Sequence, residues 1–463
     1  MDSIDRFFVS KKFLALPILV LLGAFLFDVP LGAGLSLLLL LFGVTVLVLR
    51  RLGLLRKELL LLFILALVIH AGAALFVHYA DFQPFSGGTG DYTRYQAEAE
   101  EIASRVRQGN FSLKGVGVAH AYPVIVGYAY VISAPDPFVG QMLNAWVSAL
   151  AIIFLYLLVL ELGAPVQWAF LVGVLASLYP SFLFFSSLLL KDVFVIALTL
   201  FGLLMVMKLI KEFSWKRFFL FYISLVVLIH FRFYIGFILM ATFIISWTLF
   251  SSMEIKKRIF YVFFLTLLLG TAPQIFGYGY LGIPSIQGFA NPERVEFYKE
   301  QAYAPKTTQD PGEPKLGRTG GDETSVGVGR SSSFGIGTGF ESPYSFVWNS
   351  LRSLVFAFFG PFPWQLEYEK HLFLLLETIP WYFLSIMIGE GVVRSFTKNR
   401  RALSLFLFAA MAIVLLALFF SNFGIIARIR IPAMLVLLAF LPFSLTAQKI
   451  WDTMHSHLRR YGI

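Results

Sequence analysis

The stretch 87–109, GGTGDYTRYQAEAEEIASRVRQG, is the first strongly polar run of the chain, and it follows three apolar segments. From Asp91 onward its apolar residues recur at the spacing of one helix face. They are Tyr95, Ala99, Ile102 and Val106. This pattern predicts an amphipathic helix that lies along a membrane surface, where water meets the apolar segments.

Charges on the polar face of this stretch support the helix. Two pairs of opposite charge are four residues apart, a spacing that brings side chains together on a helix. They are Arg94 with Glu98 and Glu101 with Arg105. Gly109 is suited to end the helix. Asp91 then lies at its start, at the edge of the membrane. Its carboxylate is our candidate general base, and the alternative is that it only caps the helix.

The composition excludes a soluble globular protein. Hydrophobic residues make up 58% of the chain and charged residues 14%, whereas soluble domains have about half and about a quarter. There is no cysteine, so disulfides and thiolate chemistry are excluded. With about 20 apolar residues for each span, the sequence predicts an all-α polytopic membrane protein of about twelve transmembrane helices. The spans are expected near 13–27, 31–49, 59–79, 138–161, 165–184, 189–210, 217–231, 234–251, 259–276, 371–391, 402–421 and 431–448.

Five segments follow from these spans. Residues 1–79 hold three N-terminal spans, 80–137 the first outer loop, 138–276 the central spans, 277–370 a second outer loop, and 371–463 the C-terminal spans with a cytoplasmic tail. Stretches 122–134 and 346–363 are interrupted by Pro or Gly, which favours interfacial or re-entrant helices. The second is rich in aromatic residues, as a lipid headgroup boundary or plain packing would require. Residues 305–339 lack periodicity, so we expect a long mobile loop.

The distribution of basic residues predicts the orientation. In the twelve-span arrangement most Lys and Arg clusters fall on one side, which the positive-inside rule assigns to the cytoplasm. We therefore expect both termini in the cytoplasm of a multi-pass protein of the cell (inner) membrane, with the polar turns outside. The net charge of +10 is then a topology signal, and no nucleic-acid partner is expected.

Four basic residues lie at expected outer turns instead: Lys191, Arg232, Arg428 and Arg430. Arginine binds phosphate through two parallel hydrogen bonds, and lysine binds it as a point charge. Asp192 follows Lys191, and charges at this depth are costly unless they are paired, hydrated or used. Each side chain could instead anchor a span end or reach to lipid headgroups. Because several turns supply the same chemistry on one face, we favour a shared anion site.

Other candidates for chemistry are few. His120, in HAYP at 120–123, has no second histidine nearby and is interpreted as a lone polar contact. The sequence contains no P-loop, dinucleotide fingerprint, HExxH or Gly-x-Ser-x-Gly motif. The cofactor is therefore unknown: a divalent metal stays open, but there is no metal-binding motif.

Four short motifs resemble those of the GT-C superfamily of integral membrane glycosyltransferases, especially its family 39-like and ArnT-like members. They are the pattern Asp91, Tyr95, Ala99 and Gly109; HAYP at 120–123 followed by Asn144; LYPSFLFFSSLLLKD at 178–192; and RIRIP at 428–432. The resemblance implies transfer of a sugar from a polyprenyl-phosphate-linked donor to a glycan, lipid or protein acceptor on the outer face. It implies Asp91 as the base and basic residues on the lipid phosphate. Tyr95, His120 and Asp192 are predicted as further substrate-binding residues.

Two other functions remain open from the sequence. A repeat-unit polymerase or ligase of surface polysaccharide would use a diphosphate-linked oligosaccharide, which the same basic residues would suit. A transporter or lipid flippase would place charges in the middle of the membrane, on broken and repeated helices. Glu377 is the only acid well inside an apolar run, and no internal repeat is visible. We therefore favour an inverting sugar transferase with membrane lipids around it.

Overall fold

The computed structural model describes residues 11–82, 91–113, 116, 121–275, 343–365, 372–420 and 423–460. Throughout these ranges the regular structure is helical, without a strand, so the predicted all-α class is confirmed. His120, stretch 305–339 and most of the expected second outer loop 277–370 lie outside the described residues.

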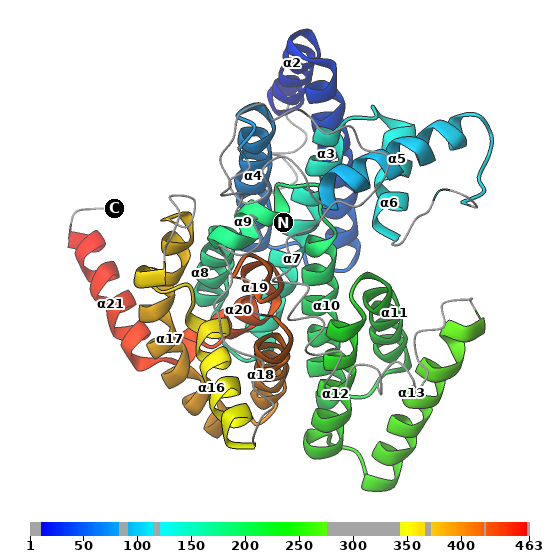
Figure 1. Ribbon diagram of the computed structural model, residues 1–463. Helices are drawn as coiled ribbons and strands as arrows, with labels where there is room; N and C mark the ends of the chain where they lie inside the picture. The colour runs from blue at the N-terminus through cyan, green and yellow to red at the C-terminus, as the bar shows by residue number, and fades with distance from the viewer. Residues whose placement is uncertain are drawn as a thin grey trace, which may run out of the picture.

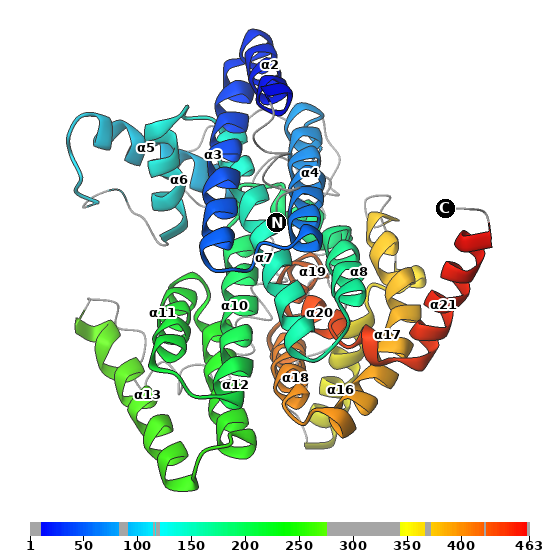
Figure 2. The same ribbon diagram turned by 180° about the vertical axis from the view of Figure 1, so that it is seen from behind.

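One helix, α7 (Pro137–Glu161), forms the centre of the molecule (Figures 1 and 2). It begins at Asp136, whose Oδ1 accepts a hydrogen bond of 2.8 Å from Phe138 N, and Pro137 occupies its first position. Around it pack α3 (Val29–Arg51), α4 (Lys57–Tyr79), α8 (Val166–Ser177) and α10 (Asp192–Lys211). Helix α2 (Lys11–Phe27) packs on α3.

The second half of the chain forms two further groups of helices. Beside α10 lie α11 (Trp215–Phe231), α12 (Phe233–Phe250) and α13 (Ile255–Ile275). The C-terminal group consists of α16 (Pro343–Phe359), α17 (Leu372–Lys398), α18 (Ala402–Phe419) and α21 (Leu445–Arg460). Helix α18 contacts both α12 and α16, and so joins the two groups.

Two apolar helices are broken near the middle. Helices α8 and α9 (Pro180–Ser186) meet at 60°, and α19 (Phe423–Ile429) meets the segment that begins with α20 (Ile431–Leu438) at 49°. Pro180 and Pro432 lie just after the breaks, and each removes a backbone donor of a continuous helix. Residues 423–429 were expected in an outer turn. They are helical because FGIIARI continues the apolar run, and the chain bends there without unwinding.

Among the described residues, six helices are long and apolar enough to cross a membrane, or eight if each bent pair is one span. This composition supports a membrane protein. The other four expected stretches are helical in α2, α11, α13 and α17, but the described residues do not confirm twelve spans.

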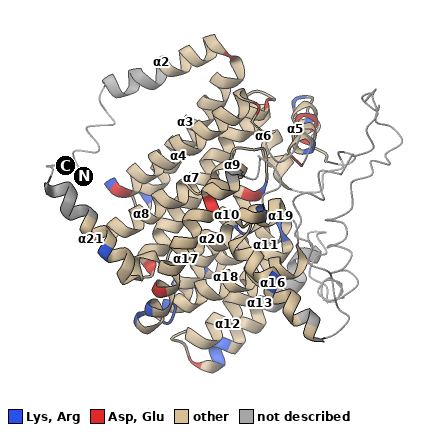
Figure 3. Cartoon of the chain, turned by 60° about the vertical axis from the view of Figure 1, so that its left-hand side comes forward, with Lys and Arg blue, Asp and Glu red and all other residues tan. Residues whose placement is uncertain are grey.

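Charged residues gather at helix ends and on α5 (Asp91–Arg107) (Figure 3). The two ends of α10 carry different clusters. At its last residue, Lys211 Nζ lies 3.7 Å from Glu161, which Arg401 approaches to the same distance. Its first residue is Asp192, about 30 Å away by the rise of a 20-residue helix. The fold thus separates the cluster at Asp192 from the basic helix ends.

Candidate functional site

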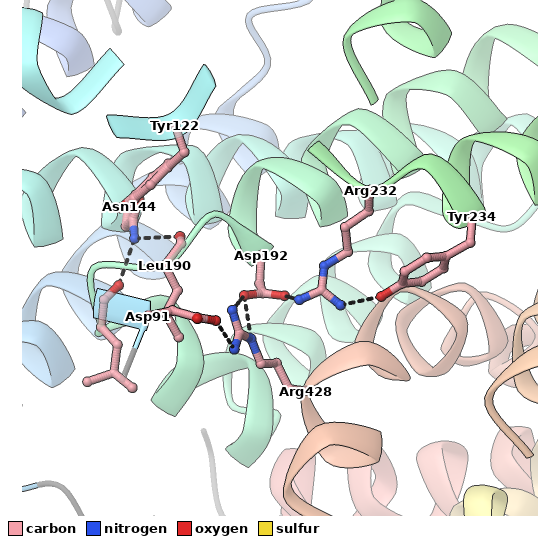
Figure 4. A network of polar contacts seen from close by, with 9 residues as sticks. Asp91, Tyr122, Asn144, Leu190, Asp192, Arg232, Tyr234 and Arg428 are labelled. Atoms are coloured by element: carbon pink, nitrogen blue, oxygen red, sulfur yellow. Dashed lines mark hydrogen bonds and ion pairs between the residues drawn. The ribbon is translucent and has the colours of Figure 1, made fainter. Parts of the chain in front are cut away.

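The site begins with the segment that precedes α10. Asn144 of α7 is fully buried, and its Nδ2 donates hydrogen bonds to Leu188 O at 2.7 Å and Leu190 O at 3.1 Å (Figure 4). Its Oδ1 accepts a bond of 3.2 Å from the hydroxyl of Tyr122 in α6 (Ala121–Ile132). Since the amide is satisfied on both sides, it fixes the backbone just before Lys191 to the central helix.

Asp192 lies between two guanidinium groups. Arg232, between α11 and α12, forms a close ion pair with Oδ1 through Nη2, and Arg428, in the last turn of α19, reaches Oδ2 through Nε and Nη2 at 2.5 Å each. The Asp192 side chain is only 5% exposed. Arg232 Nη1 also donates to Tyr234 Oη at 2.7 Å. Three helix ends, far apart in sequence, therefore meet at one buried carboxylate.

Arg428 also contacts the candidate base. Its Nη1 lies 3.1 Å from Asp91 Oδ2, and the Asp91 side chain is 55% exposed (Figure 4). The two residues are 337 positions apart in the chain. Asp91 is the first residue of α5, as expected. The exposed carboxylate is thus tied to the buried cluster by one arginine.

Lys191 completes the cluster. It is 8% exposed, and among the described residues its ammonium has no carboxylate within 4.0 Å. Burial first, and next the positive charge of Arg232, lower the pKa of Lys191 to about 8. Three basic side chains therefore face two carboxylates, which leaves one positive charge without a counter-ion. The cluster consists of Asp91, Lys191, Asp192, Arg232 and Arg428.

Tyr95 lies one helical turn after Asp91 in α5. It is buried, and its ring meets that of Tyr122 edge to face, with centroids 5.4 Å apart. Burial also raises the pKa of Tyr95, so its hydroxyl stays protonated at neutral pH. The expected ion pairs of α5 are present, with 2.6 Å between Arg94 and Glu98 and between Arg105 and Glu101. Gly109 follows the helix with a φ of 78°, as its role as a stop requires.

The apolar stripe of α5 packs on α6, a partner that the sequence did not predict. Ala99 and Ile102 are buried there. The close approach depends on Gly127, where an added Cβ would lie 2.8 Å from Ile102 Cγ2 and 3.1 Å from Ala99 O. The sequence showed the stripe but not the partner, since both lipid and a second apolar helix would satisfy it.

We expect Gly127→Ala to push α5 away from α6 and so to weaken the contact between Asp91 and Arg428. The unfolding temperature in detergent should fall by a few degrees, as for overpacking that costs about 1–3 kcal/mol. The matched control is Gly72→Ala in α4, where a Cβ would meet nothing within 4 Å. Equal unfolding temperatures for the two variants would contradict the packing argument.

Arg430 does not join the cluster. Residues two apart on a helix point to different sides, and Arg430 lies 1% exposed in another ion pair, with Nη2 2.6 Å from Glu377 Oε1. Glu377 also accepts bonds from Tyr179 Oη at 2.6 Å, from Ser181 N at 3.0 Å and from the Ser181 hydroxyl. This buried pair joins α17 to the breaks of both bent helices.

The arrangement combines an exposed carboxylate with a buried, net positive group. Such a group can bind a phosphate, and the carboxylate can accept a proton. In the part of the chain that the structure describes, no three His, Asp or Glu side chains gather as a metal site would need. Tyr234, Asn144 and Glu377 were not among the predicted site residues. Comparison of the chain with protein-family models and with curated proteins found no match in either.

Proposed function

We propose that the chain is a glycosyltransferase of a cell membrane, which moves a sugar from a polyprenyl-phosphate-linked donor to a glycan or lipid acceptor. The observation that carries the proposal is the double contact of Arg428, which pairs with the exposed Asp91 and with the buried Asp192. In this proposal Asp91 is the proton acceptor, and the cationic group beside it binds the phosphate of the donor. The resemblance of the short motifs to GT-C enzymes points the same way.

The chemistry follows from these roles. Asp91 takes the proton from an acceptor hydroxyl, and the hydroxyl oxygen attacks the anomeric carbon of the sugar. The bond between that carbon and the phosphate oxygen breaks, and its electron pair stays on the phosphate. Lys191, Arg232 and Arg428 stabilise this growing negative charge. A single displacement of this kind inverts the anomeric configuration. Arg430 takes no part, because Glu377 already engages its guanidinium.

The location of the site in the membrane is part of the proposal. We place the cluster at the extracytoplasmic face of a cell membrane and the basic ends of α10 and α17 in the cytoplasm, by the positive-inside rule. The buried cluster at the start of α10 and the basic cluster at its end are compatible with this orientation.

The test of the function is an assay with three donors. The purified chain in liposomes would receive a polyprenyl-phosphate-linked sugar, a diphosphate-linked oligosaccharide or a nucleotide sugar, together with a short glycan acceptor. We expect transfer, with inversion, from the first donor. Transfer from the diphosphate-linked oligosaccharide alone would indicate a polysaccharide polymerase. If no donor is used, the proposed enzymatic function is wrong.

Lys191 gives the site a pH dependence. Its ammonium is charged below about pH 8 and loses its charge above, so the affinity for an anionic donor should be constant below this pH and decrease above it. The groups that face it are Arg232, Asp192, Arg428 and Asp91. The measurement is KM for the donor between pH 6 and 9.5. Lys191→Met should raise KM and remove the change of KM near pH 8. Lys211→Met, at the far end of α10, should keep that change.

A further inference from the structure

The two carboxylates on Arg428 are held in different ways. Asp192 is buried in the first turn of α10, shared with Arg232, and contacted by Arg428 through two nitrogens at 2.5 Å. Asp91 is more than half exposed and receives one nitrogen at 3.1 Å. An exposed pair of this kind contributes about 0–1 kcal/mol, because water solvates the carboxylate well. Asp192 is therefore the fixed partner of Arg428, and Asp91 is the one that can leave.

The charges around Lys191 favour a replacement for Asp91. Without Asp91, three basic side chains face Asp192 alone, and two positive charges lack a counter-ion. Lys191 is nine-tenths buried and precedes Asp192, and among the described residues no carboxylate lies within 4.0 Å of its ammonium. A phosphate between Lys191 and Arg428 would supply oxygen acceptors to both, with geometry that suits the guanidinium.

We propose that a phosphate headgroup bound between Lys191 and Arg428 displaces Asp91 from Arg428, so that the carboxylate becomes available to an acceptor only after the donor has bound. The release of Asp91 for an acceptor rests on the proposed glycosyltransferase function, whereas the displacement of Asp91 by a phosphate does not. Asp91 is thus both the base and the resting counter-ion of the phosphate site.

The charge balance of the transfer agrees with this exchange. A sugar phosphodiester carries one negative charge, so it replaces Asp91 on Arg428 without changing the total. When the anomeric bond breaks, the leaving phosphate gains a second negative charge and the acceptor proton moves to Asp91. The leaving dianion then faces the two uncompensated positive charges of the cluster. The site therefore matches the product phosphate better than the donor, as stabilisation of a leaving group requires.

The experiment measures phosphate binding without turnover. Purified wild type, Asp91→Asn and Asp81→Asn, in nanodiscs of neutral lipid, are titrated with farnesyl phosphate and, separately, with inorganic phosphate. Asp81 is the control because it is an exposed acid of the same loop, and its φ of 47° is one that asparagine tolerates. Asp91→Asn removes the competing carboxylate, so it should bind farnesyl phosphate roughly fivefold more tightly than wild type and Asp81→Asn.

A double-mutant cycle separates exchange at Arg428 from a general change in charge. Lysine at position 428 keeps the charge but cannot contact two carboxylates with the same fork of donors. In Arg428→Lys, the added Asp91→Asn change should therefore have little effect on affinity. If the tightening persists at full size in this background, or is absent in the single variant, the exchange is overturned.

The separate titrations with farnesyl phosphate and with inorganic phosphate identify the source of the anion. Tightening for both probes, or for farnesyl phosphate alone, supports a lipid phosphate in the site. Tightening for inorganic phosphate alone supports the exchange with a soluble anion and excludes the lipid headgroup. If the binding results agree with the exchange while no sugar donor is turned over, the exchange stands and the proposed enzyme fails.

Discussion

Asp91→Asn is expected to abolish sugar transfer while leaving the fold unchanged. Asparagine has the same shape but cannot accept the proton of an acceptor hydroxyl, and loss of a general base lowers the rate by about 10²–10⁴-fold. The loss should fall on kcat, because Lys191 and Arg428 bind the phosphate and both are kept. KM for the donor should decrease, by roughly the fivefold gain in phosphate affinity, because Asp91 no longer competes for Arg428. The measurement is kcat and KM for a polyprenyl-phosphate-linked sugar at saturating acceptor.

Two controls make the result specific. Asp81→Asn changes another acid of the first outer loop and should keep full activity. Equal unfolding temperatures for wild type and Asp91→Asn would show that the exposed carboxylate does not stabilise the fold. If Asp91→Asn turns over the donor at the wild-type rate, the residue only begins helix α5, as in the alternative interpretation of the sequence, and the base lies elsewhere.

The sequence predicted the helices well because their signal is local. Runs of apolar residues set the helix positions, and the pairs four residues apart in α5 are formed as expected. What surrounds each helix was harder to predict. The stripe at Ala99 and Ile102 would pack equally well on lipid or on another helix, and the close contact with α6 depends on the missing side chain of Gly127. Likewise, Pro432 shows that the chain bends, but not whether the preceding residues form a turn or a helix.

The site was predictable in part, for a related reason. Charges next to apolar runs must find partners, so the sequence could indicate that Lys191, Asp192, Arg232 and Arg428 matter. It could not show that Arg428 meets Asp91, 337 positions away. We grouped Arg428 with Arg430 because they are close in the sequence. However, side chains two residues apart on a helix point in different directions. Glu377, an acid within an apolar run, also required a cation, and Arg430 is that cation.

Glu377→Gln is expected to destabilise the protein more than any change at an exposed ion pair. The side chains of Glu377 and Arg430 are 1% and 2% exposed, so the change leaves a guanidinium buried without its counter-ion. Breaking such a pair costs about 3–5 kcal/mol. The matched control is Glu212→Gln, because Glu212 is 73% exposed beside Arg217 and its pair contributes about 0–1 kcal/mol. The measurement is the free energy of unfolding in detergent, by denaturant or by heat.

A double variant distinguishes the charge from the packing. With Arg430→Met added, no unpaired charge remains, so Glu377→Gln together with Arg430→Met should unfold less readily than Glu377→Gln alone. Recovery will be partial, because the carbonyl groups of Gly360 and Ala357 lose the donor that Arg430 Nη1 provides at 2.8 and 3.3 Å. A double variant that is less stable than Glu377→Gln alone would mean that these hydrogen bonds to the end of α16 contribute more stability than the ion pair.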